Sequence, residues 1–296
     1  MKICLAADAN YLQHLIVTMA SVIINSNPEE PLEFTVLTDG SIHPDCLNGI
    51  SLSRSYGVRV INAAELVHEH MEIDAECRWP VAVYYRLLLP SLCESDSRII
   101  YLDCDTIVRK SLDELWNLPM KESSIAGVPD DGFGHKKRLA QYGVQLENEY
   151  LNSGVMLWNL DRIRSGDYER KLKDAGMRLP NPEFPDQDWI NIMFDAEKKI
   201  IPPKWNAMSH IFEQERNAAI NSTEELFAAK CDPYICHFTN IKPWTMTYTA
   251  HPFWLEYWEY LASTPFAGRK YWGIIKKRFL SSDQSLLYRL VRFIKK

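Results

Sequence analysis

The chain has 296 residues, of which 46% are hydrophobic and 24% are charged, and its formal net charge is −6. This composition gives enough apolar side chains for a sizeable core and excludes collagen-like, coiled-coil and low-complexity chains. Residues 268–296 hold nine Lys and Arg against one acid, so the remaining chain is strongly acidic and lacks the basic track that a nucleic-acid partner requires.

The first part of the chain alternates strand-like and helix-like patterns. A short apolar run is followed by polar Asp8 and Asn10, and then by apolar residues at helical spacing. Strand, helix, strand, helix and strand are predicted in this order at 3–7, 12–23, 34–40, 44–55 and 58–62. Such an order predicts a parallel sheet with helices on its faces.

The middle of the chain continues the pattern. A helix is expected from about residue 82 to Pro90, and Ser111 is a suitable N-cap for another. Further strands are predicted at 98–108, in SSIAGVPDD and at 152–160. Ligands of open α/β sheets bind at the carboxyl ends of the strands, so we expect the polar residues there to converge. These are Ala7-Asp8, Asp103 to Asp105, Asp130 and Asp131.

Two acids mark the strand in YLDCDTIV. Asp103 and Asp105 flank Cys104, and because a strand alternates sides, both carboxylates are expected to point one way and Cys104 the other. Two facing like charges repel unless a hard divalent cation neutralises them, and a nucleotide diphosphate can complete its ligand shell. Taken alone, the pair favours a solvated acidic turn.

A histidine and a lysine follow another apolar run, in PYICHFTNIKPW. The imidazole of His237 suits Mn²⁺ beside carboxylates, whereas Mg²⁺ sites seldom recruit one. Lys242 offers a mobile point charge for phosphate. By itself, His237 favours a structural histidine at a strand end.

Six motifs occur in order along residues 1–260: AADANY, VYYRLLLP, YLDCDTIV, YLNSGVMLWNL, FPDQDWIN and CHFTNIKPW. In this combination the chain resembles the family 8 glycosyltransferases, the retaining group that includes glycogenin and bacterial lipopolysaccharide galactosyl- and glucosyltransferases. The resemblance implies an α/β GT-A fold, a Rossmann-like domain with a mostly parallel central sheet. It also implies a UDP-sugar donor, Mn²⁺ or Mg²⁺ as cofactor, and a saccharide or glycolipid acceptor. We expect the catalytic domain to span 1–262.

The resemblance assigns roles to individual residues. The implied metal ligands are Asp103, Asp105 and His237, and the implied catalytic residues are Asp186, Gln187 and Asp188. The implied substrate-binding residues are Ala7, Asp8, Asn10, Arg86, Asp103, Cys104, Asp105, Asp130, Asn152, Ser153, Asp186, Gln187, His237, Asn240 and Lys242.

Some of these roles are more specific. The opening motif would hold uracil and ribose, Asn152 and Asp186 the donor sugar, and Asp130 the acceptor. Gln187 would lie beneath the anomeric carbon, and as a feeble nucleophile it favours a front-face reaction that retains configuration. From the residues alone, DQD also fits the first turn of a helix, where acids favour the dipole. Gly154 allows close backbone approach or is a plain strand glycine.

The last motif departs from the family's pattern, H-x-x-G-x-x-K-P-W. Asn240 stands at the position of the glycine, and the loop to Lys242 is one residue shorter. Either Lys242 reaches the β-phosphate by another path or its role is weakened. The alternatives are therefore a weakened UDP-sugar-binding protein and another metal-dependent nucleotide-sugar enzyme.

Residues 263–296 form a basic C-terminal segment. One helical face in SLLYRLVRFIKK is apolar, and it consists of Leu286, Leu287, Leu290, Val291 and Ile294. Basic amphipathic segments bind membrane interfaces, so we expect 268–296 to contact an anionic membrane, and a helix packed on the body or on a partner is the alternative. No apolar run approaches the about 18 residues that cross a bilayer, and no signal peptide is recognisable. The expected location is the cytoplasm, peripheral on the inner face of the membrane.

Overall fold

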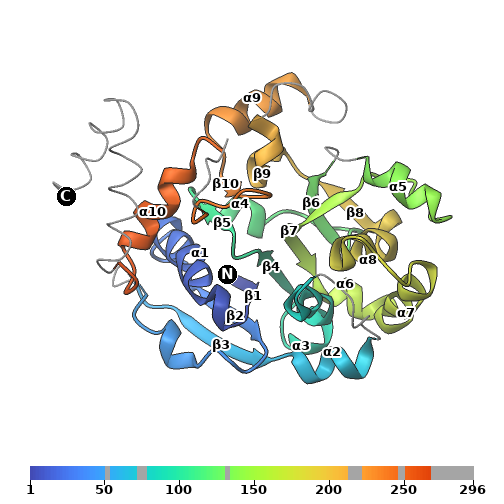
Figure 1. Ribbon diagram of the computed structural model, residues 1–296, viewed down its shortest axis with the longest axis horizontal. Coiled ribbons are helices and arrows are strands. Elements are labelled where there is room, and N and C mark those ends of the chain that lie inside the picture. Colours follow the sequence, from blue (N-terminus) through green and yellow to red (C-terminus); the bar gives the residue numbers. More distant parts are fainter. Residues whose placement is uncertain (51–53, 72–78, 131–133, 213–221, 246–250, 268–296) are drawn as a thin grey trace.

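The computed structural model is drawn in Figure 1 with the chain coloured from blue at the N-terminus. It describes residues 1–50, 54–71, 79–130, 134–212, 222–245 and 251–267. Asp131 and the basic segment 268–296 lie outside the described residues. None of the described helices is long and apolar enough to cross a membrane.

A seven-stranded sheet forms the centre of the molecule, in the order β3-β2-β1-β4-β7-β6-β8. Its strands are β1 (Lys2–Ala6), β2 (Glu33–Thr38), β3 (Gly57–Asn62), β4 (Arg98–Leu102), β6 (Ile125–Pro129), β7 (Leu151–Asn159) and β8 (Lys198–Ile200). Neighbours pair in parallel except at β7, which is antiparallel to both β4 and β6. The sheet is therefore mostly parallel, which confirms the predicted α/β class.

A second, three-stranded sheet has the order β5-β10-β9. Its strands are β5 (Thr106–Val108), β9 (Ala207–Met208) and β10 (Ile235–His237). The prediction of one strand over 98–108 was wrong, because a turn at 103–105 separates β4 from β5 and the two belong to different sheets. Both strands are buried, so the apolar pattern on the two sides of the turn gave no sign of the break.

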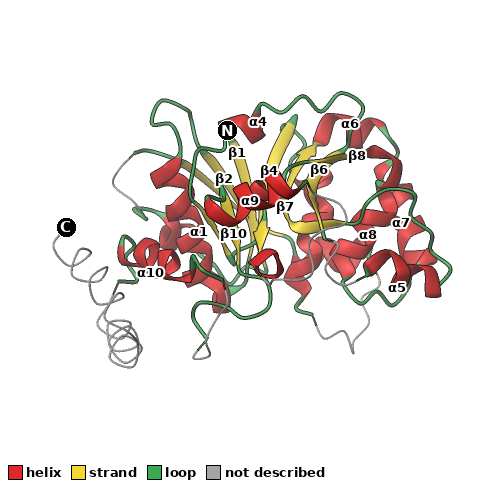
Figure 2. Ribbon diagram, turned by 90° about the horizontal axis from the view of Figure 1, so that it is seen from above, coloured by secondary structure: helices red, strands yellow, loops and turns green. Residues whose placement is uncertain are grey.

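Helices cover the large sheet on both sides, as Figure 2 shows. The α-helices are α1 (Leu12–Asn25), α2 (Ala64–His70), α3 (Leu89–Leu92), α4 (Asp113–Trp116), α5 (His135–Gln141), α6 (Leu160–Ser165), α7 (Tyr168–Arg178), α8 (Pro185–Met193), α9 (Thr223–Cys231) and α10 (Trp254–Ala262). Short 3₁₀ helices span Ala9–Tyr11, Pro44–Leu47, Val81–Leu88, Asp195–Glu197, Pro203–Trp205 and Ser209–Phe212.

Because strand side chains alternate, successive residues of one strand enter different cores. Leu5 of β1 packs in one core with Leu15 of α1, whereas neighbouring Cys4 packs in another with Tyr85 and Trp189. The second core lies beneath the 3₁₀ helix Val81–Leu88 and helices α7 and α8. The 3₁₀ helix and α8, which carry predicted site residues, are thus anchored by large buried side chains.

Two helix predictions need correction. The segment 44–55 forms only a 3₁₀ turn over Pro44–Leu47 among its described residues. The helix expected to end near Pro90 is a 3₁₀ helix that passes into α3, and Pro90 lies in the first turn of α3. Proline is tolerated there because the first helical N–H groups have no intrahelical partner.

Candidate active site

Asp103 and Asp105 lie in the turn between β4 and β5, at the carboxyl end of the central strand of the large sheet. The turn is fixed by backbone bonds, since Asp103 N donates to the carbonyl of Gly154 (2.7 Å) and Thr106 N to that of Asp103 (3.2 Å). The two carboxylates therefore share a direction because of the turn. The expected cause, the alternation of side chains along a strand, does not apply here.

His237, the last residue of β10, completes this group. Its Nε2 lies 3.2 Å from Oδ1 of Asp105 and 3.9 Å from Oδ2 of Asp103. One ligand atom from each of the three residues falls within 4.8 Å of the others. The pairing of His237 with Thr106 across β10 and β5 sets this proximity.

Gly154, near the start of β7, leaves the space that the group needs. A Cβ at this position would lie 2.6 Å from Oδ2 of Asp103 and closer still to Cε1 of His237. No side chain fits there without displacing one of these groups. The close-approach role expected for Gly154 thus accounts for it better than a plain strand glycine does.

The donor set fits a divalent metal. Two carboxylates and an imidazole suit Mn²⁺ better than Mg²⁺, because harder Mg²⁺ favours oxygen ligands alone. The space kept open by Gly154 adjoins Oδ2 of Asp103 and Cε1 of His237. The chemistry of the three side chains and the open space beside Gly154 are therefore both compatible with a bound metal ion.

Lys242 reaches Asp105 although the loop that precedes the lysine is shortened. Its Nζ donates to Oδ2 of Asp105 and to the carbonyl of Phe238. Burial opposes ionisation of Asp105, but the Lys242 ammonium beside it outweighs that effect and holds the pKa of this carboxyl well below its usual range. Asn240 has a φ of 68°, a left-handed conformation that asparagine tolerates better than most residues, so it can replace the usual glycine.

Arg86 is a buried arginine, 5% exposed, that joins two of the acids. Its guanidinium lies 2.8 Å from Asp103 and 3.1 Å from Asp186, and it covers the ring of Tyr101. Burial opposes its charge, yet the two acids raise its pKa. Burial also raises the pKa of Asp186, although Arg86 offsets part of that effect. Arg86 thus neutralises a site that would otherwise hold adjacent negative charges.

The other side of the site is a network of buried amides. Asn152 Nδ2 donates to Oε1 of Gln187 (3.0 Å) and to Oδ2 of Asp130 (3.2 Å), and Gln187 Nε2 donates to the same Asp130 oxygen (3.2 Å). Asp130 is buried, which opposes ionisation, but its pKa is lowered because His135 and Asn152 face it. These side chains are held in fixed orientations without a ligand.

A cavity of about 280 Å³ opens onto these groups. The predicted site residues that line it are Arg86, Asp103, Asp105, Asp130, Asn152, Ser153, Asp186, Gln187, His237, Asn240 and Lys242. The structure thus brings together most of the predicted set from six separate stretches of the chain.

The remaining predicted residues lie outside this lining. Asp8 caps the 3₁₀ helix after β1 by accepting from the N–H groups of Asn10 and Tyr11, and Ala7 is buried beside it. Cys104 directs its thiol to the carbonyl of Ala6.

Asp188 also lies apart from the cavity lining. It is fully buried, where it accepts from Arg138 and from the hydroxyl of Tyr150. Asp186 and Gln187 belong to the first turn of α8, as the helix interpretation of DQD predicts. Within this turn Asp186 faces the cavity, whereas Asp188 is buried against Arg138 and Tyr150.

The structure adds residues that the sequence did not indicate. The cavity is also lined by Trp79, Val83, His135, Phe184 and Thr239, and Asn206 lies behind His237. Some of these residues lie outside the six motifs. The others lie within a motif but have side chains with no distinctive chemistry. No spacing pattern in the sequence could have identified them.

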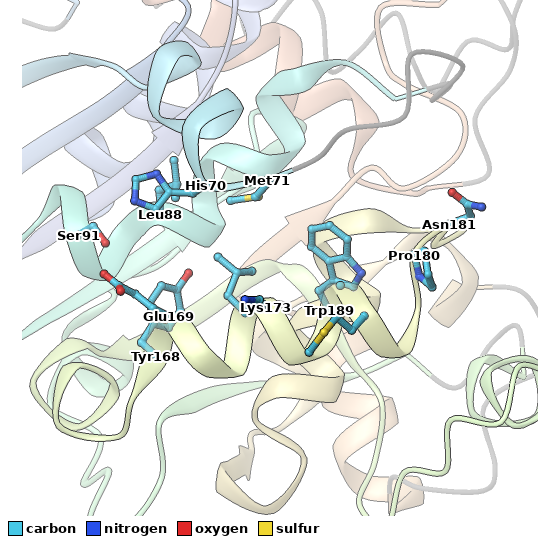
Figure 3. A pocket seen from close by; sticks show the side chains of 13 residues that line it. His70, Met71, Leu88, Ser91, Tyr168, Glu169, Lys173, Pro180, Asn181 and Trp189 are labelled. Atoms are coloured by element: carbon cyan, nitrogen blue, oxygen red, sulfur yellow. The ribbon is translucent and has the colours of Figure 1, made fainter.

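A larger hollow of about 800 Å³ lies on the other side of α8, where Figure 3 shows Trp189, Tyr168 and Lys173 around it. Gln187 and Trp189 are two positions apart on the helix, so they project to nearly opposite faces. The described lining of this hollow mixes apolar side chains with a few separate polar and charged ones, and holds no cluster of acids. We place the candidate active site in the smaller cavity, where charged and amide groups converge.

Comparison with known proteins identifies the family of the chain. The family model for glycosyl transferase family 8 matches residues 2–247. General stress protein A of Bacillus subtilis is 28% identical over 274 residues, covering 89% of this chain and 94% of that protein. Lipopolysaccharide 1,3-galactosyltransferase of Salmonella typhimurium is 25% identical over 255 residues, covering 82% of this chain and 72% of that one.

Among solved structures, galactosyltransferase LgtC in complex with donor and acceptor sugar analogs has a TM-score of 0.73 at 21% identity. The match covers 93% of this chain and all of that one. At this identity the likeness shows the fold, which is of the predicted GT-A type.

Proposed function

The chain belongs to glycosyl transferase family 8 and is a glycosyltransferase, and from this premise we propose that it transfers a hexose from a UDP-sugar to a saccharide acceptor. The observation that carries the proposal is the convergence of Asp103, Asp105 and His237 in one cavity with two cations, Arg86 and Lys242. A site of this charge pattern suits a diphosphate bound through a divalent metal.

We assign Asp103, Asp105 and His237 as the metal ligands, with Mn²⁺ as the favoured ion. When bound, the metal would neutralise negative charge on the diphosphate as the glycosidic bond breaks. Lys242 lies beside Asp105 and is placed to share this electrostatic stabilisation. Its ion pair with Asp105 supports the reading in which the shortened loop keeps the lysine in the site.

The amide network is the natural place for the donor sugar. Asp186 and Asn152 offer acceptors and donors for sugar hydroxyls, and Arg86 fixes Asp186. Gln187 Oε1 accepts from Ser153 N and Asn152 Nδ2, both at 3.0 Å, so the Gln187 side chain is held as a polar surface. An amide is a poor nucleophile, and we therefore assign Gln187 to stabilisation of positive charge at the anomeric carbon.

The reaction then follows a front-face course. The acceptor hydroxyl oxygen forms a bond to the anomeric carbon on the face from which the β-phosphate oxygen departs. The electron pair of the broken bond stays with UDP, and the departing phosphate takes the hydroxyl proton. Configuration at the anomeric carbon is retained. Asp130, which lines the cavity within the amide network, is assigned to acceptor binding.

Asp188 receives a different role from the one that the family resemblance implies. Its carboxylate is buried and bound by Arg138 and Tyr150. It also accepts from the N–H of Phe184, at the start of α8. We propose that Asp188 holds the first turn of α8, and through it Asp186 and Gln187, in position.

The names of the relatives support a surface-glycan acceptor. The similar proteins include a lipopolysaccharide 1,3-galactosyltransferase and a lipopolysaccharide 1,2-glucosyltransferase, the latter 29% identical over 249 residues. We propose galactose or glucose as the transferred sugar and lipopolysaccharide or another surface glycan as the acceptor. Action at the inner face of the membrane, with 268–296 as the contact, is part of this proposal. A chain ending at residue 267 that binds anionic vesicles as well as the full chain does would exclude that contact.

The test is UDP release from a panel of UDP-sugars, with and without Mn²⁺. We expect release that depends on Mn²⁺ and on a hexose donor, and an α-linked donor that gives an α-linked product by NMR. A β-linked product would exclude the front-face course. Binding of UDP-sugars without any release or transfer would instead identify a weakened binding protein.

A further inference from the structure

Asn206 lies directly behind His237 and does not itself line the cavity. It follows the 3₁₀ helix Pro203–Trp205, precedes β9, and is fully buried. Because β9 pairs with β10, Met208 lies opposite His237, and Asn206 comes close to the far side of the imidazole. Oδ1 of Asn206 lies 2.9 Å from Nδ1 of His237.

The direction of this hydrogen bond follows from a backbone group. The N–H of Gly154 can only donate, and it donates to Oδ1 of Asn152 at 3.0 Å. Nδ2 of Asn206 donates to the same oxygen at 2.9 Å. The carbonyl oxygen of Asn206 must therefore face His237, where it accepts the proton of Nδ1.

An imidazole with its proton on Nδ1 carries its lone pair on Nε2. Nε2 is the ring atom that faces Asp105 and Asp103. A fixed tautomer and ring orientation of this kind is what metal-binding histidines obtain from their outer partners.

We propose that Asn206 is a positioning residue for the divalent metal, because it fixes the tautomer and orientation of His237 and ties them to Asn152. This inference rests on the metal site of the proposed function and adds a residue to it. Asn152 in turn donates to Gln187, so the same amides connect the metal side of the cavity with its sugar side.

Asparagine is the residue that this position requires. It must accept from one neighbour and donate to the other, both within a fully buried space. Leucine of similar size would leave Nδ1 of His237 and Oδ1 of Asn152 with one partner fewer. Aspartate would keep the acceptor toward His237 but face Asn152 with a second acceptor.

The experiment measures the affinity of the protein for Mn²⁺ alone, by electron paramagnetic resonance of the free ion. Asn206→Leu is expected to weaken Mn²⁺ binding by about 10- to 100-fold. Asn206→Asp is expected to keep an affinity near that of the wild type, because it still accepts from Nδ1. Asn25→Leu is the matched control, since Asn25 bonds to Ser21, Val108 and Tyr260 and does not touch the site.

A double-mutant cycle separates positioning from general damage. If Asn206 acts through His237, then Asn206→Leu has no further effect on Mn²⁺ affinity once His237→Ala is present. Additive losses, or unchanged affinity in Asn206→Leu, would overturn the inference while leaving the proposed metal site intact. A wild-type protein that binds no Mn²⁺ would overturn the metal site itself. If the leucine variant is unfolded at the temperature of the measurement, the Mn²⁺ affinity of Asn206→Asp is compared with that of the wild type. A large loss of affinity in Asn206→Asp would then overturn the inference.

Discussion

Nε2 of His237 lies 3.2 Å from Oδ1 of Asp105, although the two residues are far apart in the sequence. The antiparallel pairing of β10 with β5 brings them together, and the turn after β4 adds Asp103. The three-stranded sheet thus brings the three proposed metal ligands together at the carboxyl end of β4.

Removing a ligand should abolish metal-dependent turnover. Asp103→Asn or His237→Ala is expected to lower Mn²⁺-dependent release of UDP from a UDP-hexose by at least about 100-fold, because the two remaining ligands hold the ion only weakly. Asp167→Asn, an exposed acid paired with Arg170, is the control and should retain full activity. Full activity of both ligand variants in the presence of a chelator would contradict the metal site.

Gly154→Ala should act like the loss of a ligand. The added Cβ would lie 2.6 Å from Oδ2 of Asp103 and would displace either that carboxylate or His237. We expect Mn²⁺ affinity to fall while the protein remains folded. The control is Gly176→Ala in α7, where the nearest atom to a Cβ is 3.8 Å away on Trp189. Alanine should stabilise that helix by up to about 1 kcal/mol.

Arg86→Met tests the buried charge balance. Without the guanidinium, Asp103 and Asp186 are left as adjacent acids in a buried site, so stability at pH 7 should fall by about 3–5 kcal/mol. Urea denaturation measures the change. Arg170→Met is the comparison, because Arg170 is exposed and its ion pairs are screened by solvent, so only a small effect is expected.

Two buried histidines predict how stability depends on pH. Burial lowers the pKa of His14 and of His251 from 6.5 to about 4. Between these values the unfolded chain binds a proton that the folded protein does not, so stability rises with pH in that window. Each histidine therefore costs on the order of 3 kcal/mol of stability when the pH falls from 6.5 to 4.

His14→Gln should flatten this dependence by one proton. The glutamine removes the titrating group and can still accept from the hydroxyl of Tyr257, which lies 2.6 Å from Nδ1 of His14. Urea denaturation at several pH values between 4 and 7 gives the slope. His43→Gln, at an exposed position, controls for the substitution itself. An unchanged slope in His14→Gln would show that folding does not lower the pKa of His14.

Most strands of the main sheet could be predicted from the sequence, because buried parallel strands appear as short apolar runs between turn residues. The prediction placed the starts of β1, β2, β3 and β7 within two residues, and it identified Asp186 and Gln187 as the first turn of a helix. Most of the site was found because its residues lie in motifs at strand and helix ends.

Other features depend on contacts that no local pattern records. The three-residue strands β5 and β10 become visible only as a pair, and Asn206 matters only because β9 brings it behind His237. His135 stacks on Tyr150 beside Asp130, again through the tertiary fold. A lone asparagine or histidine outside a motif has no spacing that distinguishes it from a surface residue.

The reversal of β7 has a consequence for how such a protein can diversify. Because β7 runs against its neighbours, it begins where they end, and Asn152 and Gly154 belong to a strand and not to a connecting loop. Insertions in the surrounding loops can therefore reshape the entrance while these two residues keep their register. A lineage could change this entrance many times without rebuilding the part of the molecule that we propose binds the donor.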